Sequence, residues 1–374
     1  MEKHAMEKPT KESSVTDNFV NTGEVLLEVK NIKKYYPILK GFMRKKIGEV
    51  KAVDDVSLYI NRNETLGLVG ESGCGKTTLG RCVMRAIEPT EGDVLLHLNK
   101  DEEPVNITKL DRAQLREIRR HMAIIFQNPY SSLNPRMTVL DIVSEPLVLN
   151  GYPKEQIIDK VSELVEMVGL QKRFLNRYPH AFSGGQRQRI GIARALALSP
   201  KLIVADEAVS ALDVSIQAQI LNLLQDLKES MQPTFLFIAH DLSVIEHVSD
   251  RVGVMYVGRL VELAPTDEIY TTPRHPYTEA LLSAIPRPEP GAAKNRILLP
   301  GEVANAANLP SGCCFHPRCR YAKPQCSEEV PALEEISFGH YVACHRAKEL
   351  NLRGINDIDH ANYDNINFKR SEQS

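Results

Sequence analysis

Residues 70–77 read Gly-Glu-Ser-Gly-Cys-Gly-Lys-Thr, which matches the phosphate-binding pattern G-x-x-x-x-G-K-[ST] at every fixed position. The apolar run 65–69 before it predicts a buried strand, and residues 77–84 after it predict the start of a helix. Glycines let such a loop curl so that its N–H groups point at phosphate oxygens, and the helix N-terminus adds partial positive charge. The stretch therefore predicts a strand-loop-helix unit that holds a nucleotide. The alternative is a glycine-rich turn with a chance Lys-Thr pair, and the flanking strand and helix argue against it.

Each residue of this loop has an expected role toward the nucleotide. Lys76 is expected to reach the β- and γ-phosphates, and the Thr77 hydroxyl is expected to ligate Mg²⁺. The other contacts to the nucleotide are expected from Gly70, Glu71, Ser72, Gly73, Cys74, Gly75 and Thr78.

The composition argues against several other classes of protein. The 374 residues are 43% hydrophobic and 25% charged, as in ordinary globular proteins, and the length suits two domains. The net charge of -2 gives no drive toward nucleic acid or anionic lipid. No apolar run reaches the ~18–20 residues that span a bilayer, and residues 1–21 lack the apolar core of a secretory signal. We therefore expect a soluble, intracellular protein whose membrane role comes through partners.

Strands and helices alternate over most of the chain, which predicts an α/β fold. The run 202–205 is apolar throughout, as in a parallel strand that is buried on both faces. Residues 138–200 are mostly helical, and the basic segment 37–48 is interpreted as a solvated hairpin in preference to a binding patch. The helix after Pro153 is expected to bury one face, formed by Ile157, Ile158, Val161, Leu164, Val165 and Val168.

These patterns divide the chain into four parts. The expected parts are a disordered segment 1–23, a nucleotide-binding domain 24–265 with a helical subdomain at about 130–200, a cysteine-containing extension 266–350 and a flexible tail 351–374.

Two carboxylates, Asp206 and Glu207, directly follow the apolar run 202–205. At the end of a strand beside a phosphate loop, Asp206 can hold Mg²⁺, usually through water. Glu207 would then lie where it can orient and deprotonate the attacking water. An acidic pair on the surface is the alternative, and the upstream phosphate loop favours the functional interpretation.

A second glycine pair occurs in residues 183–186, Ser-Gly-Gly-Gln, before a segment that reads as a helix. The helix N-terminus could face a phosphate, or Ser183 could simply cap the helix. Taken in isolation, the capped loop is favoured.

The order of the motifs resembles the ATPase subunit of ATP-binding cassette (ABC) transporters. The resemblance covers roughly residues 25–265 and implies a P-loop NTPase cassette with a helical subdomain, in which ATP is the nucleotide. The series consists of 70–77, Gln127, 183–186, 206–207, 210–213 and His240.

The resemblance implies a role for each remaining motif. Tyr36 would stack on adenine, with the neighbouring Tyr35 as the alternative. Gln127 would contact Mg²⁺ and the attacking water and face the membrane subunits, and His240 would sense the γ-phosphate. The signature motif, which binds the γ-phosphate held by the opposite subunit, would consist of Ser183, Gly184, Gly185 and Gln186.

The same resemblance implies a dimer in which ATP lies between two cassettes. The phosphate loop would come from one cassette and the signature from the other, with Asp213 of the D-loop between the two sites. Two small departures occur: Phe182 stands where the family usually has Leu, and Ala208 where Pro is usual. Neither touches a catalytic group, so we expect the ATPase to be competent.

Three further stretches are similar to the oligopeptide/dipeptide importers: residues 127–137, residues 274–282 and the cysteine-rich segment 311–344. The closest resemblance is to the F-type ATPase of these systems. It implies a paralogous D-type ATPase as partner in a heterodimer, two membrane permease subunits, an extracellular peptide-binding protein, and a peripheral position on the cytoplasmic face of the membrane. Importers of nickel, glutathione or antimicrobial peptides share related cassettes. A non-transport ABC ATPase acting on nucleic acid or ribosomes is disfavoured by the single cassette and the net charge.

Five of the seven cysteines lie in residues 313–344. Cys313, Cys319, Cys326 and Cys344 give the spacing C-x5-C-x6-C-x17-C. Four thiolates can hold a [4Fe–4S] cluster or Zn²⁺, and the thiols could also be unliganded or form disulfides. The resemblance implies a [4Fe–4S] cluster with a structural or docking role. Its alternative ligands are Cys314, His316 and His345.

Overall fold

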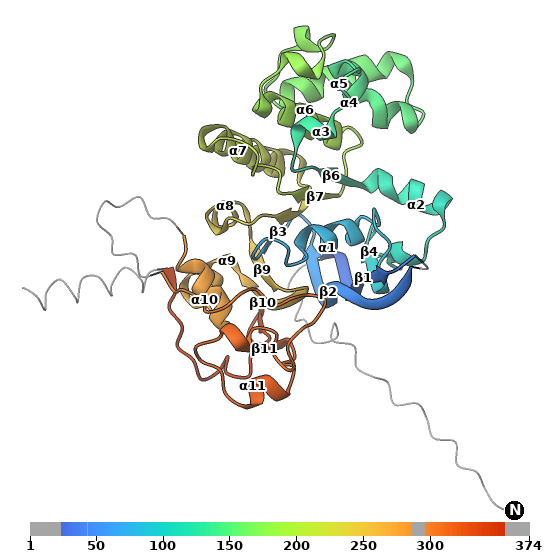
Figure 1. The fold of residues 1–374 in the computed structure, drawn as a ribbon. Helices are drawn as coiled ribbons and strands as arrows, with labels where there is room; N and C mark the ends of the chain where they lie inside the picture. The colour runs from blue at the N-terminus through green and yellow to red at the C-terminus, as the bar shows by residue number, and fades with distance from the viewer. Residues whose placement is uncertain (1–23, 43, 286–295, 356–374) are drawn as a thin grey trace, which may run out of the picture.

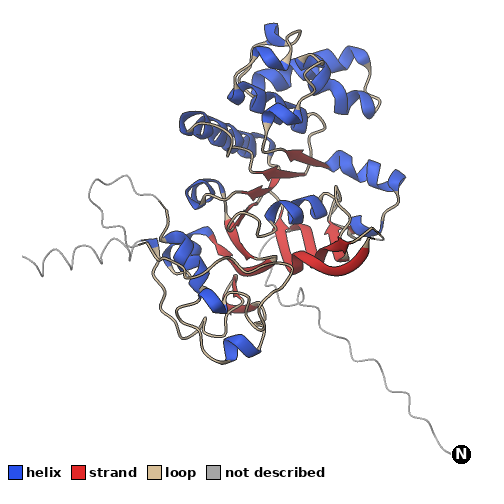
Figure 2. Ribbon diagram, viewed as in Figure 1, coloured by secondary structure: helices blue, strands red, loops and turns tan. Residues whose placement is uncertain are grey.

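The computed structural model describes residues 24–42, 44–285 and 296–355, and these fold around two β-sheets (Figures 1 and 2). The expected disordered segment 1–23 and most of the expected tail lie outside the described residues. The larger sheet has the strand order β11-β12-β10-β9-β3-β8-β7-β6, and the smaller has the order β2-β1-β4-β5.

The larger sheet has a parallel centre, as the continuous apolar runs predict. Strands β6, β7, β8, β3 and β9 pair in parallel, and every residue of β3, β7 and β8 is buried. Only a strand that is covered on both faces favours such uninterrupted apolar sequence. The strands are β3 (Thr65–Val69), β6 (Met122–Ile125), β7 (Leu202–Asp206), β8 (Thr234–Ile238), β9 (Arg251–Tyr256) and β10 (Arg259–Pro265).

The smaller sheet is antiparallel and is dominated by a long hairpin. The sequence predicted strands at 25–29 and 53–60 with a hairpin loop between them. The structure confirms the hairpin but extends both strands, so that the turn is confined to residues near Gly41 and Arg44. The sheet consists of β1 (Val25–Lys40), β2 (Lys45–Asn61), β4 (Glu91–Leu96) and β5 (Val105–Asn106).

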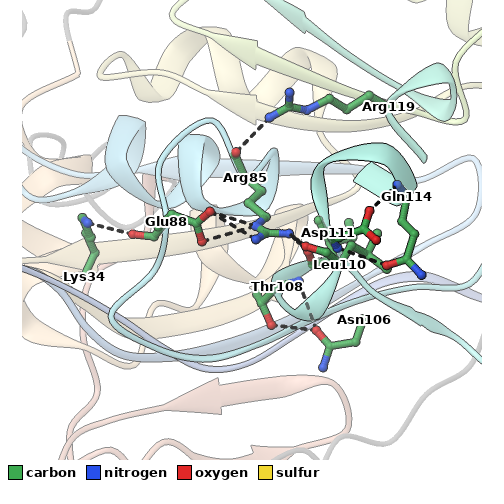
Figure 3. A network of polar contacts seen from close by, with 10 residues as sticks. Lys34, Arg85, Glu88, Asn106, Thr108, Leu110, Asp111, Gln114 and Arg119 are labelled. Atoms are coloured by element: carbon green, nitrogen blue, oxygen red, sulfur yellow. Dashed lines mark hydrogen bonds and ion pairs between the residues drawn. The ribbon is translucent and has the colours of Figure 1, made fainter. Parts of the chain in front are cut away.

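Arg85 fastens this sheet to the helix that follows the phosphate loop (Figure 3). It directly follows the C-cap of α1 (Lys76–Val83) and donates to the carbonyls of Ile107, at 3.0 Å, and Leu110. Its Nε also contacts Glu88, whose own carbonyl accepts from Lys34 of β1 at 2.7 Å. The Arg85 guanidinium therefore links the end of α1 to the segment that follows β5 and, through Glu88, to β1.

The helical lobe lies at the top of Figure 1 and contains α3 to α6. The predicted helix after Pro153 is α5, and most of its predicted face is buried. The prediction was wrong for Ile158, which is 55% exposed because the residue after Ile157 turns about 100° away from the buried stripe. The helices are α3 (Pro129–Ser132), α4 (Val139–Leu149), α5 (Lys154–Met167) and α6 (Gly184–Leu196).

Further helices cover the larger sheet and join its strands. Within the described residues, no helix is both long enough and apolar enough to cross a membrane. The helices are α2 (Arg112–Ile118), α7 (Val214–Met231), α8 (Leu242–Val248), α9 (Thr266–Thr271) and α10 (Pro276–Leu282). The short 3₁₀ turns are η2 (Ile107–Lys109), η3 (Arg119–His121), η4 (Lys172–Phe174), η5 (Pro179–Ala181) and η6 (His316–Arg318).

The carboxy-terminal residues continue the larger sheet and share its core. Strand β12 (His340–Val342) pairs with β10, and β11 (Glu334–Ser337) pairs with β12. Phe315, which precedes α11 (Gln325–Glu328), packs on Tyr256 of β9 and Tyr277 of α10, with ring centroids 5.2 and 5.5 Å apart. The predicted boundary at residue 265 coincides with the end of β10, but hydrophobic packing crosses it.

Candidate nucleotide-binding site

The phosphate loop lies between β3 and α1, as the sequence predicted. Two of its glycines are required by close approach of the backbone. A Cβ on Gly70 would lie 2.2 Å from the Met255 carbonyl oxygen, and one on Gly75 would lie 2.1 Å from that of Ala52. Both residues also have positive φ, 150° and 106°, where other residues are strained. Ser72 and Gly73 are exposed at the tip of the loop, and Thr78 lies in the first turn of α1.

Lys76 points its ammonium group into the loop. Its Nζ donates to the carbonyls of Gly70 at 2.7 Å and Glu71 at 3.1 Å, and the residue is only 4% exposed. A buried ammonium needs such partners because desolvation of its charge is costly. The cation is therefore held at the centre of the loop that the sequence assigned to phosphates.

Thr77 and Asp206 meet beside the loop. The Thr77 hydroxyl donates to Asp206 Oδ1 at 2.7 Å, although the two residues are 129 positions apart. Burial raises the pKa of Asp206, and the hydrogen bond from Thr77 opposes part of that shift. A hydroxyl and a carboxylate are oxygen ligands of the kind that Mg²⁺ prefers, and the cation would compensate the buried negative charge. The donor set therefore fits Mg²⁺.

Glu207 is the centre of a group of three polar side chains. Gln127 Nε2 donates to Glu207 Oε2 at 2.6 Å, and His240 Nδ1 lies 3.5 Å from the same oxygen. The Glu207 backbone has a φ of 48°, uncommon for a residue with a side chain, and its N–H donates to the Ile238 carbonyl at 2.9 Å. The structure thus brings together three predicted residues from three separate loops, in an arrangement that can orient a water molecule.

The segment 183–186 begins α6 and lies apart from the phosphate loop of the same chain. Ser183 caps the helix in a capping box with Gln186, so the capped-loop interpretation is correct as local structure. Gly185 packs so closely on α7 that a Cβ would lie 2.4 Å from Ile216 Cγ2, whereas Gly184 is less crowded. In Figure 1, α6 belongs to the upper lobe, whereas α1 lies below that lobe, in the middle of the molecule. Asp213 caps α7 by accepting from the Ile216 N–H at 3.0 Å.

The two neighbouring tyrosines of β1 differ in their availability. Tyr35 donates its hydroxyl to Asp54, and its ring lies 5.4 Å from Lys51 Nζ. Tyr36 is 39% exposed, with Lys34 Nζ 5.0 Å from its ring centroid. Tyr36 is therefore the tyrosine whose ring is freer to stack on a ligand.

Comparison with known proteins explains this combination of sites. Residues 53–210 match the family model described as ABC transporter, and residues 261–326 match the one described as oligopeptide/dipeptide transporter, C-terminal region. The chain is 51% identical over 326 residues to the oligopeptide transport ATP-binding protein AppF of Bacillus subtilis, which covers 86% of this chain and 97% of that protein. The chain belongs to the ABC transporter ATP-binding proteins.

Other relatives of this ABC ATPase support the same family assignment. It is 48% identical to the dipeptide transport ATP-binding protein DppF of Haemophilus influenzae, which covers 87% of this chain and 98% of that protein. Among solved structures, it is similar to a dimeric ATP-binding cassette in a post-hydrolysis state bound to ADP and Pi, with a TM-score of 0.56 and 30% identity. That match covers 64% of this chain and 99% of the cassette. The predicted cassette fold, ATPase activity, and use of ATP and Mg²⁺ are therefore confirmed.

The four predicted cysteine ligands line one small cavity in the extension of the ABC ATPase. Cys313, Cys319, Cys326 and Cys344 all face it, together with His316 and His345. Burial raises the pKa of Cys313, Cys319 and Cys344 to about 11. Within the described residues, however, no group of three or more His, Cys, Asp or Glu side chains is arranged to hold a metal ion. Convergence of the cysteines is observed, but a formed ligand set is not.

Two residues that the sequence analysis missed reach the phosphate loop from the extension of this ABC ATPase. The Glu71 N–H donates to Tyr277 Oη at 2.9 Å, and the Glu71 carboxylate accepts from Arg318 at 2.9 and 3.4 Å. The segment that contains Arg318 attracted attention only for its cysteine spacing. Nothing in the local sequence indicates a contact with a residue 247 positions away.

Proposed function

We propose that this ABC ATPase powers the import of oligopeptides or dipeptides. The observation that carries the proposal is the presence, in one chain, of the nucleotide site and of residues 261–326, which match the oligopeptide/dipeptide transporter C-terminal region. Relatives near 50% identity whose names specify oligopeptide and dipeptide transport support the same solute class. Import of nickel, glutathione or another solute is the alternative, and action on nucleic acid is disfavoured.

The site residues are assigned as follows in this proposal. The phosphate loop and Lys76 bind the triphosphate, and Tyr36 stacks on adenine. Thr77, Gln127 and Asp206 would hold Mg²⁺, and the ion would neutralise phosphate charge. Glu207 takes the proton of the attacking water, since its carboxylate is already oriented by Gln127 and His240.

ATP binding is proposed to close a dimer, because the signature of one chain lies apart from its own phosphate loop. Ser183 to Gln186 would then serve the ATP of the opposite cassette, with Asp213 between the two sites. We propose that this opposite cassette is a paralogous D-type ATPase. The division into a nucleotide-binding domain (24–265, with the helical subdomain at about 130–200) and an extension (266–350) belongs to the same proposal.

The membrane partners are proposed to be two permeases, which receive solute from an extracellular peptide-binding protein. A groove of about 560 Å³ lies between β6, α4 and α6, next to Gln127. Phe126, 40% exposed, and Leu149, 61% exposed, offer it apolar surface beside Arg119 and Arg120. Such a groove suits a short helix from a permease and would place the chain peripherally on the cytoplasmic face of the membrane.

For the extension we propose a [4Fe–4S] cluster bound by Cys313, Cys319, Cys326 and Cys344, with Zn²⁺ as the alternative. The support is that all four line one cavity. Because thiols must lose their protons to bind a metal, their raised pKa values mean that binding would release protons. Iron, acid-labile sulfide and zinc contents of the purified protein test this assignment, and a protein free of all three would refute it.

The transport proposal is tested by peptide uptake in cells that lack this chain and are complemented with the wild type or with Lys76→Ala. We expect that only the wild type restores uptake. Uptake that persists without the chain across a range of peptides would refute the peptide assignment. Parallel uptake of nickel and glutathione would then show whether the alternative holds.

A further inference from the structure

Glu71 is the second residue of the phosphate loop, and its N–H, its carbonyl and its carboxylate each have a hydrogen-bond partner. Its N–H donates to Tyr277 Oη at 2.9 Å, and its carboxylate accepts from Arg318 Nη1 at 2.9 Å and Nη2 at 3.4 Å. Its carbonyl accepts from Lys76 Nζ at 3.1 Å. Two of these three partners belong to the carboxy-terminal extension, and the third is the lysine expected to contact phosphate.

The two partners from the extension are rigidly placed. Tyr277 is fully buried in α10, and Arg318 is only 8% exposed at the end of η6. Phe315 packs against Tyr277 and against Tyr256, and the Arg318 guanidinium lies 5.9 Å from the Tyr256 ring centroid. One aromatic cluster therefore positions both partners of Glu71, the Tyr277 hydroxyl that accepts from its N–H and the Arg318 guanidinium that donates to its carboxylate.

The negative charge of Glu71 makes its pairing with Arg318 important for nucleotide binding. A carboxylate in a loop that surrounds a triphosphate repels the ligand, and the repulsion is strong where solvent is excluded. Paired with Arg318 through two N–H groups, the carboxylate is directed toward the extension and its charge is compensated. The pair also fixes the Glu71 backbone, whose carbonyl helps to hold Lys76.

We propose that Arg318 and Tyr277 are positioning residues for ATP binding, through which the extension sets the conformation and the charge of the phosphate loop. This inference depends on ATP binding by the chain and not on which solute is transported. A failed uptake experiment and a failed test of this inference are therefore distinguishable.

The test is the affinity of the full chain for MgATP, measured by calorimetry for the wild type and for variants. Arg318→Ala removes a charge-assisted pair, so we expect its affinity to fall on the order of tenfold. Tyr277→Phe removes only one hydroxyl, and a loss of roughly threefold is expected. With ATPase activity as the readout, KM for ATP should rise while kcat at saturating ATP is retained, because the catalytic groups are untouched.

Arg320→Ala is the matched control. Arg320 lies two residues further along and also pairs with a glutamate, but within the extension: its Nη2 donates to Glu279 Oε1 and Oε2, each at 3.0 Å. We expect this variant to lower the melting temperature without changing the affinity for MgATP. If Arg320→Ala weakens ATP binding as much as Arg318→Ala does, the effect is general destabilisation and the proposal is wrong.

A double variant isolates the charge of Glu71. In the Arg318→Ala background, Glu71→Gln removes the uncompensated carboxylate, so that part of the lost affinity should return. Arg318→Lys should also restore part of it, since it keeps the charge but not the two-pronged geometry. Unchanged affinity in Arg318→Ala, or no recovery in either rescue variant, would overturn the inference.

Discussion

The hydrogen bond between Thr77 and Asp206 gives a prediction that can be worked out from the structure. Thr77→Val keeps the shape of the side chain but removes the hydroxyl that donates to Asp206 Oδ1 at 2.7 Å. Asp206 is only 4% exposed, and water cannot readily replace the lost donor. A hydrogen bond to a charged group contributes about 1.5–3 kcal/mol, and we expect the nucleotide-free protein to lose that much stability at neutral pH.

The pH dependence of this loss has a definite sign. Burial already raises the pKa of Asp206, and removal of a bond to its charged form raises it further. The cost of Thr77→Val is therefore full where Asp206 is ionised and falls as the pH drops through its pKa. Denaturant unfolding at neutral and acidic pH measures this difference.

A double-variant cycle decides whether the reasoning is right. Asp206→Asn removes the charge, so Thr77→Val should cost at least about 1 kcal/mol less in that background than in the wild type. Calorimetry should also show that Mg²⁺ no longer strengthens ATP binding in Thr77→Val as it does in the wild type. Equal costs in the two backgrounds, or an undiminished effect of Mg²⁺, would refute the argument.

Three further predictions concern separate parts of the molecule. Glu207→Gln should reduce ATP hydrolysis by about 10²–10⁴-fold, and size-exclusion chromatography should show that an ATP-bound dimer accumulates. Undiminished turnover would show that Glu207 is not the general base. Tyr36→Ala should weaken ATP binding about tenfold through lost stacking, as measured by calorimetry. Equal weakening for inorganic triphosphate, which has no base to stack, would point to another cause. Burial lowers the pKa of His340, but its bonds to Glu262 and Glu268 outweigh this effect and raise the pKa. The stabilisation by protonated His340 is therefore complete below the unfolded-state pKa of about 6.5 and is lost as the pH rises through the higher folded-state pKa. The melting temperatures of His340→Gln and the wild type should accordingly converge at alkaline pH.

The features that could be predicted from the sequence are those that carry their own local signal. The phosphate loop has fixed spacing, the strand before Asp206 is apolar throughout, and the capping box at Ser183 is contained within four residues. The length of the β1–β2 hairpin was underestimated, because its outer half is largely exposed, mixes lysines with apolar residues and lacks the regular apolar alternation that marks a strand.

The contact of Arg318 with Glu71 could not be predicted for a different reason. An ion pair between distant segments leaves no periodicity or spacing in the sequence, and each residue sits in a motif that suggests another role. Likewise, the cysteine spacing predicted a set of metal ligands. The four cysteines line one cavity, but spacing alone does not determine how the sulfur atoms are oriented.

The pairing of Glu71 with Arg318 constrains how these ATPases can diverge. A substitution at either position leaves an unpaired charge beside the phosphate loop, so we expect neither residue to be replaced while the other remains. Among ABC ATPases we expect the acidic residue to persist in lineages that keep the extension, and to vary in lineages that lost it. An extension grafted onto a foreign cassette would accordingly need an acidic residue at the matching loop position.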